Sequence, residues 1–160
     1  MADGGASELI MLISGLLVAG IVTTLLIASW GGLATTVETA QTQVEANSKT
    51  RAALAGDPMQ VSWNQTSCNL TLQIQNTGNL ELTRDNLGVI VNGTGSTITQ
   101  TQLLDNSSVW VSGEVAELYV CPTGITMTAG QEIIVTVVVQ SEPYQGISGQ
   151  HSFSEVVRLV

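Results

Sequence analysis

The chain has 160 residues and a formal net charge of −9, with only four lysine and arginine side chains against thirteen aspartates and glutamates. This balance argues against nucleic-acid binding, because so few cations cannot neutralise a phosphate backbone. Charged residues make up 11% of the sequence, against about 25% in average soluble domains, so hydroxyl and amide side chains must supply most of the polar surface.

Residues 9–28 form an apolar stretch without a charge, a proline or an aromatic side chain. A helix of about 20 residues, rising ~1.5 Å per residue, spans the ~30 Å hydrocarbon core of a bilayer. The hydroxyls of Ser14, Thr23 and Thr24 can donate to carbonyls one turn back. We therefore predict a membrane helix, either a lone anchor or one that packs with its own copies. Its membrane and assembly surface is predicted to comprise Leu9, Leu12, Gly15, Leu16, Ala19, Gly20, Leu25 and Trp30.

A narrower apolar stripe follows the membrane stretch, at spacings of four and three residues: Leu33, Val37, Ala40 and Val44. It predicts that the helix continues past Gly31 and Gly32, runs to about Leu54 and stops at residues 56–58, where glycine and proline occur. The predicted domains are a helical part, 1–56, and an external β domain, 57–160. The stripe needs a partner, which is either the chain's own β domain or a neighbouring subunit.

Beyond residue 58 the apolar period changes to two. Leu70, Leu72 and Ile74 alternate with polar side chains, which is typical of a half-buried strand. Seven segments predict strands: 68–75, 88–92, 97–104, 108–111, 114–120, 132–140 and 151–160. Short strands separated by glycine-rich turns predict an all-β antiparallel sandwich of immunoglobulin-like type, with Trp110 and residues 133–139 in its core.

The β domain carries the marks of an extracellular protein. Cys68 and Cys121 can close a disulfide worth ~2–4 kcal/mol in an oxidising compartment, or remain two buried thiols. N-glycosylation motifs begin at Asn64, Asn69, Asn92 and Asn106, all after the membrane stretch. Together these features predict a domain outside the cell.

No motif predicts catalysis. The single histidine, His151, lies in a predicted strand without a nucleophile elbow or a zinc-ligand spacing near it. We expect no enzyme activity, no catalytic, cofactor-binding or metal residues, and no small-molecule substrate.

The orientation in the membrane rests on opposing signals. Lys49 and Arg51 follow the apolar stretch, and the positive-inside rule would place the β domain in the cytoplasm. Both residues lie roughly 20 positions beyond the stretch, at the limit of that rule. We predict a cytoplasmic N-terminus and an external β domain.

The start, ASELIMLISGLLVAGIVTTLL, and the passage CNLTLQIQNTGNLEL…VIVNG…VWVSG…ITMTAGQEIIVTVVV resemble the anchors and head domains of archaeal relatives of type IV pilins. The resemblance is strongest to archaellum accessory proteins of the FlaG and FlaF type. It implies a pilin-like layout and a non-catalytic, structural role in the archaellum, the archaeal motility organelle. Such a protein is anchored in the cytoplasmic membrane, with its head contacting the S-layer or other archaellum proteins.

Two alternatives remain open. A filament subunit, either an archaellin or an adhesive pilin, would form a homo-oligomer and would be cut after Gly5. The start MADGG has the glycine of a cleaved leader without a basic residue, which favours an uncleaved accessory protein with Met1 intact. The third reading is a surface-anchored module that binds a ligand such as a glycan.

Overall fold

The computed structural model of the chain describes residues 4–160. Packing separates the residues up to Gln41 from a second compact unit, Thr42–Val160, which we call the head unit. The functional division into 1–56 and 57–160 stays a prediction. The predicted intact Met1 lies outside the described residues.

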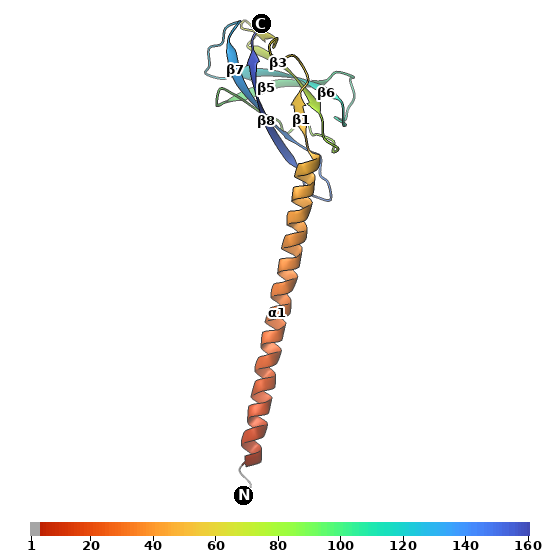
Figure 1. The fold of residues 1–160 in the computed structure, drawn as a ribbon, viewed down its shortest axis with the longest axis vertical. Coiled ribbons are helices and arrows are strands. Elements are labelled where there is room, and N and C mark those ends of the chain that lie inside the picture. The colour runs from red at the N-terminus through yellow and green to blue at the C-terminus, as the bar shows by residue number, and fades with distance from the viewer. Residues whose placement is uncertain (1–3) are drawn as a thin grey trace. The chain divides into compact units, whose positions relative to one another are not determined.

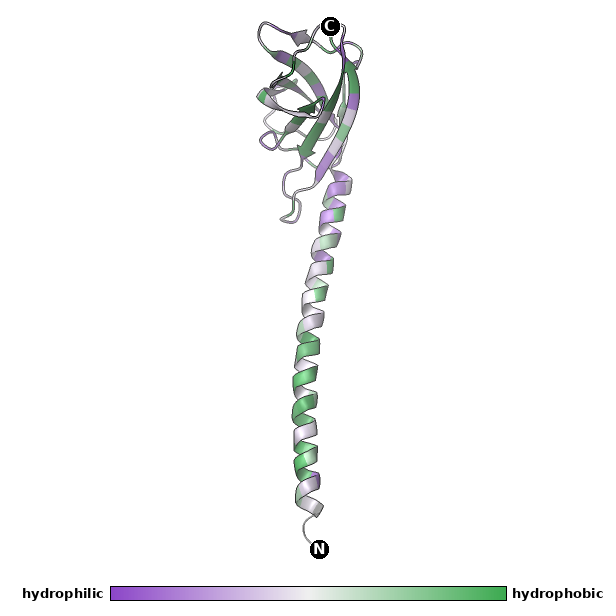
Figure 2. Cartoon of the chain, turned by 90° about the vertical axis from the view of Figure 1, so that its left-hand side faces the viewer, coloured by the Kyte–Doolittle hydropathy of each residue, from purple (hydrophilic) through white to green (hydrophobic). Residues whose placement is uncertain are grey.

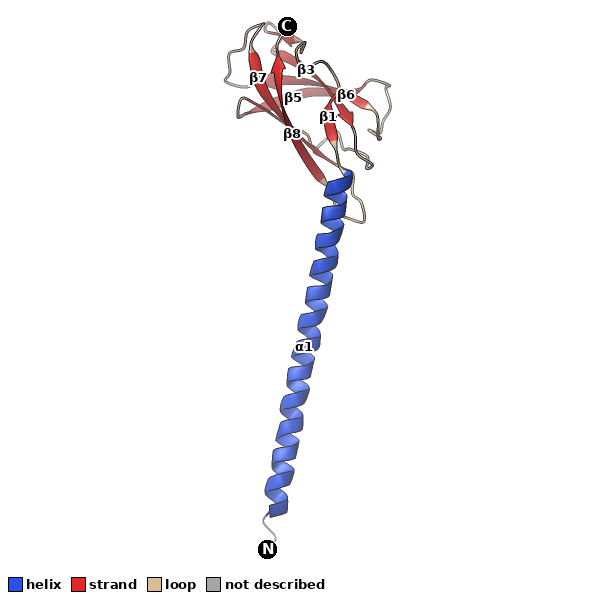
Figure 3. Cartoon of the chain, in the orientation of Figure 1, coloured by secondary structure: helices blue, strands red, loops and turns tan. Residues whose placement is uncertain are grey.

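Helix α1 comprises Gly4–Lys49 and continues through Gly31 and Gly32 without a break (Figures 1 and 3). Its 46 residues correspond to a length of about 70 Å. The predicted hydroxyl bonds are confirmed: Ser14 donates to the Ile10 carbonyl at 2.8 Å, Thr23 to Ala19 at 2.7 Å and Thr24 to Gly20 at 2.7 Å. The polar groups of the apolar stretch are thus satisfied within the helix, as a hydrocarbon environment requires.

The predicted continuation of the helix to Leu54 is wrong. α1 ends at Lys49, and Ala52–Leu54 form the short strand β1. β1 pairs antiparallel with the end of β3 (Asn69–Asn76), and this pairing buries Ala52. The local sequence favours a helix, but strand pairing with a distant segment supplies the backbone bonds and the burial that decide the conformation.

The remaining strands are β2 (Trp63–Asn64), β4 (Gly88–Val91), β5 (Thr94–Leu103), β6 (Val115–Pro122), β7 (Glu132–Gln140) and β8 (Gln150–Arg158). All pairs among these strands are antiparallel, in the order β1-β3-β6-β5-β4-β7-β8, with β2 beside β3. The sheet folds back on itself (Figure 1). An isolated parallel bridge from Val61 to Leu159 links the segment before β2 to the segment after β8. The predicted all-β antiparallel sandwich after a long helix is confirmed, with a single, nearly closed sheet forming both layers.

The core of the head unit follows the period of two. Leu70, Leu72 and Ile74 on β3 are completely buried, and they belong to one core cluster with Val89, Val91 and alternate residues of β7. Trp110 is buried, as predicted. Two expectations are wrong. Residues 108–111 form no strand and contribute only an isolated bridge from Trp110 to Leu82. Only alternate residues of 133–139 are core, since one face of β7 meets solvent, and Ile134 is 53% exposed.

Candidate assembly surfaces

The apolar surface of α1 between residues 9 and 28 faces outward on every side. Leu9, Leu16 and Leu25 are all strongly exposed, and α1 is long and apolar enough to cross a membrane. A Cβ atom added to the small residues Gly15 or Gly20 would meet no neighbouring atom within 4 Å. Their small size therefore serves no packing within this chain, and it leaves room for another helix to approach.

Beyond residue 28 the helix surface becomes one-sided (Figure 2). Trp30 is 74% exposed and borders a shallow apolar groove, which continues along Leu33, Ala34 and Val37. The other sides carry threonines, whose hydroxyls bond to carbonyls of their own helix. The predicted stripe of Leu33, Val37, Ala40 and Val44 is thus an exposed apolar seam on an otherwise polar segment.

The end of α1 is attached to the rest of the head unit by one buried residue and by hydrogen bonds from its flanks. Ala46 is completely buried, the Gln43 amide donates to the Ser148 carbonyl at 3.2 Å, and the Gln150 amide donates to Asn47 Oδ1 at 2.9 Å. Val44 is 68% exposed. Within the head unit, this last position of the stripe is therefore left uncovered, and the partner of the stripe stays a prediction.

An ionic cluster joins the helix end to the loop before β8. Lys49 Nζ lies 2.6 Å from Glu45 Oε1, donates to the Tyr144 hydroxyl at 3.2 Å and sits 4.4 Å from the centre of the Tyr144 ring. The hydrogen bond from Lys49, together with its charge, lowers the pKa of the Glu45 carboxyl. The same hydrogen bond raises the pKa of Lys49. All three groups are accessible to solvent, so we expect the cluster to orient the loop more than to stabilise the fold.

Backbone amides of the turn after β3 donate hydrogen bonds to carbonyls at the end of α1 and just beyond it. The Asn79 amide donates to the Lys49 carbonyl at 2.8 Å, and the Gly78 amide donates to the Arg51 carbonyl at 3.1 Å. Asn76 is completely buried and holds this turn: its amide group donates to the carbonyls of Leu80 and Trp110 at 2.9 and 3.0 Å. The sequence analysis did not predict this role of Asn76, for which the signal was an asparagine at the end of an apolar strand.

The position of Gly78 in the same turn has no room for a side chain. A side-chain carbon at this position would collide with the Lys49 carbonyl oxygen and the Arg51 amide nitrogen. Both are backbone atoms of the segment that leaves the helix, and they cannot rotate away. The close approach explains why glycine fits here.

The two cysteines and the glycosylation motifs lie on the head unit. Cys68 and Cys121 form a disulfide with a Cα–Cα distance of 5.2 Å, joining the start of β3 to the paired strand β6. Asn64, Asn92 and Asn106 are exposed, whereas Asn69 is half-buried in β3, between β2 and β6. The structure therefore gives the four motifs unequal accessibility.

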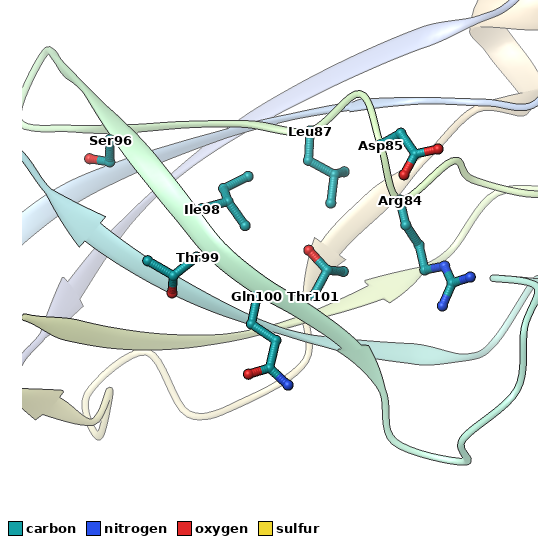
Figure 4. A pocket seen from close by; sticks show the side chains of 8 residues that line it. All are labelled: Arg84, Asp85, Leu87, Ser96, Ile98, Thr99, Gln100 and Thr101. Carbon is teal, nitrogen blue, oxygen red and sulfur yellow. The ribbon is translucent and has the colours of Figure 1, made fainter. Parts of the chain in front are cut away.

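A polar groove lies between strand β5 and the segment that precedes β4 (Figure 4). Arg84, Asp85 and Leu87 line one side, and the other side comprises Ser96, Ile98, Thr99, Gln100 and Thr101. Their hydroxyl, amide, carboxylate and guanidinium groups suit hydrogen bonding to another polar surface.

The lone histidine lies away from this groove. Burial lowers the pKa of His151, and the charge of Arg51 adds to the effect. Its ring stacks near Phe153, with the ring centroids 6.4 Å apart. Within residues 4–160, no group of three histidine, cysteine, aspartate or glutamate side chains is placed to share a metal ion.

A long apolar helix that leads into an antiparallel β-sandwich defines the pilin-like class of surface proteins. Comparison with known families gives the particular one: the archaeal-type flagellin family matches residues 2–153, and the chain belongs to this family. No curated protein and no solved structure matches the chain. Membership makes the protein a structural component of the archaellum, in a family of structural rather than enzymatic proteins.

Proposed function

We propose that the protein is a membrane-anchored archaellum subunit whose head lies outside the cytoplasmic membrane and contacts the S-layer or other archaellum proteins. The observation that carries the proposal is the change along α1 from a surface that is apolar on all sides to one that is apolar on one side. A helix in lipid needs apolar side chains all round, whereas a helix in water keeps them only where a partner covers them.

The polar sides of residues 30–44 weigh against a filament core. A helix enclosed by several neighbouring subunits would bury more than one face, but the polar residues Thr35 and Thr39 lie on the other sides of the helix. One seam suits one partner helix. The self-assembling filament subunit, archaellin or adhesive pilin, is the second candidate, since the family description itself names flagellins.

The external location draws support from the disulfide and the exposed glycosylation motifs. Disulfides persist in oxidising compartments, and oligosaccharides are attached to surface loops. Cys68 and Cys121 are the only cysteines of the chain and are bonded to each other. An introduced cysteine is then the only free thiol, which makes orientation measurable.

The first test maps orientation in the native host. Ala129→Cys, on an exposed position in the turn before β7, is compared with Ala6→Cys at the start of α1, using a membrane-impermeable maleimide on intact cells. We expect labelling of Ala129→Cys alone. Labelling of Ala6→Cys alone would place the head in the cytoplasm and refute the proposal.

The second test separates the anchored subunit from the filament subunit. Cells are sheared, and the protein is quantified in the membrane fraction and in the released filaments, which are then viewed by electron microscopy. We expect the protein to remain with the membrane. Recovery as the main subunit of sheared filaments would establish the second candidate instead.

A further inference from the structure

Strand β5 has a second neighbour along only part of its length. Its pairing with β6 runs from Ser96 to Leu103, whereas its pairing with β4 covers residues 94–96 only. Where the pairing with β4 stops, the polar groove opens between β5 and the segment before β4, with a volume of about 550 Å³ (Figure 4). Over residues 97–101, no strand of the described chain lies beside the β4 edge of β5.

The backbone of β5 directs hydrogen-bonding groups to this open edge. Residues of an antiparallel strand bond alternately to the neighbour on one side and to the neighbour on the other. The two-residue turn of residues 92–93 makes Ser96 a residue that bonds to β4, so Ile98 directs its N–H and C=O groups to the same edge. Thr99 is the extra residue of a bulge, and it shifts the alternation so that Thr101 also faces this edge.

The open edge is held in place by the rest of the head unit. The Thr99 hydroxyl donates to the Tyr119 carbonyl at 2.9 Å, which fixes the bulge to β6. Leu87 and Ile98 are half-buried, pack against the core and give the groove an apolar floor. An incoming strand would therefore bond to an edge that is already formed, and it would not pay for ordering that edge.

Arg84 brings an unpaired positive charge to one end of the groove. Among the described residues, its guanidinium has no hydrogen-bond or ion-pair partner, and Figure 4 shows it turned away from the Asp85 carboxylate, at the Thr101 end. The chain has only four lysine and arginine side chains against thirteen acidic ones. A carboxylate is the group that a guanidinium binds with the best geometry, through two parallel hydrogen bonds.

The lining of the groove favours a peptide over a sugar. None of the described residues that line it is aromatic, so a sugar ring has no flat surface on which to stack. The open edge instead offers alternating backbone donors and acceptors, which the backbone of an extended peptide complements.

We propose that this groove binds an extended segment of another protein, which joins the sheet as a strand antiparallel to β5 and places an acidic side chain against Arg84. An antiparallel strand begins at the Thr101 end of the groove, so the acidic residue belongs at the N-terminal end of the segment. The site goes beyond the proposed function and does not depend on how the protein is anchored.

The test measures the binding of short fluorescent peptides to the full chain in detergent by fluorescence anisotropy, with empty micelles as the blank. The probe alternates threonine and valine and begins with aspartate. Two further probes carry methyl groups on alternate backbone nitrogens, in one frame or the other. We expect methylation in one frame to weaken binding at least about tenfold and methylation in the other frame to have little effect, because only one edge of the peptide bonds to β5.

Two variants locate the site on the protein. Thr101→Pro removes an N–H group from the open edge and leaves the bonds to β6 in place, so binding should weaken about tenfold, and circular dichroism checks that the sheet is retained. Arg84→Gln, at an exposed side chain, should weaken binding of the aspartate peptide about fivefold and leave a peptide that begins with asparagine unaffected. Arg158→Gln, the matched control at an exposed arginine outside the groove, should leave the affinity unchanged.

Three results would overturn the proposal. The first is that no peptide binds saturably at millimolar concentration, and the second is that both methylated peptides bind equally well. The third is displacement of the peptide by maltotetraose, which would make the groove a sugar site. None of these results bears on the labelling and shearing experiments, so the proposed function would stand or fall separately.

Discussion

Replacing Asn76 by alanine should lower the free energy of unfolding of the head unit by more than the small size of the asparagine side chain suggests. The side chain is completely buried and makes three hydrogen bonds: it donates to the carbonyls of Leu80 and Trp110, and its Oδ1 accepts from the Gly78 amide at 3.0 Å. Each intramolecular hydrogen bond contributes about 1 kcal/mol net, and a buried group left unsatisfied costs more. The expected loss is about 3 kcal/mol, a large share of the ~5–15 kcal/mol that stabilises a typical domain.

Two of the three groups that bond to the Asn76 side chain keep another hydrogen bond in the variant, which limits the loss of stability. The Gly78 amide keeps a bond to the Arg51 carbonyl, and the Trp110 carbonyl keeps the Leu82 amide at 3.0 Å. The Leu80 carbonyl loses the donor that the Asn76 side chain supplies. We therefore expect a decrease of no less than about 2 kcal/mol in the free energy of unfolding.

The assay is equilibrium unfolding in denaturant, followed by tryptophan fluorescence, since the buried Trp110 adjoins Asn76. Asn79→Ala is the matched control, because Asn79 is exposed three residues away in the same turn. Asn76→Asp keeps the shape but replaces two donors by an acceptor that faces carbonyls. Wild-type stability in Asn76→Asp would refute the hydrogen-bond argument.

Three further predictions concern the head unit. Cys68→Ala with Cys121→Ala should lower the free energy of unfolding by about 4 kcal/mol in the chain-entropy account, since the cysteines are 53 residues apart; equal stability of the reduced and oxidised protein would contradict it. Glu45→Gln should be less stable than the wild type at neutral pH, and the difference should vanish in acid. The reason is that the pKa of Glu45 is lowered in the folded state. The stability that the carboxylate contributes is present above the ordinary glutamate pKa and is lost as the pH falls through the folded-state pKa. A gap in unfolding free energy that does not shrink as the pH falls below the ordinary glutamate pKa would exclude the Lys49 pair as its cause. Asn69→Gln should leave the glycan mass of host-expressed protein unchanged, because Asn69 lies in a strand paired on both sides. Glutamine at the exposed Asn64, Asn92 or Asn106 should remove glycan mass wherever that site is occupied. Intact-protein mass spectrometry measures both effects.

The sequence predicted the parts of the fold that depend on local periodicity. The apolar run of residues 9–28 predicted the helix, and the alternation in residues 69–76 predicted a strand with one buried face. The glycine-rich turns expected between strands include Asn92-Gly93 between β4 and β5, where φ is 48° and 82°. These features need no knowledge of distant segments.

The failures occurred where a distant segment decides the conformation. Residues 50–54 have helical propensity, but β3 offers Ala52 and Leu54 an edge to pair with, and the helix ends early. Trp110 was correctly placed in the core and wrongly placed in a strand, because burial of one large side chain does not require a ladder of backbone bonds.

The seam of α1 also combines a feature that local periodicity predicts with one that depends on distant segments. Its spacing could be read from the sequence, because a helix repeats its faces at a fixed period. The burial of the helix end could not be predicted in the same way, since it depends on where Ser148 and Gln150 bond to residues 43 and 47 after folding. Periodicity alone determined the helix, the strands and the apolar stripe. Contacts between residues far apart in the sequence decided where the helix ends, and that Ala46 is buried while Val44 stays exposed.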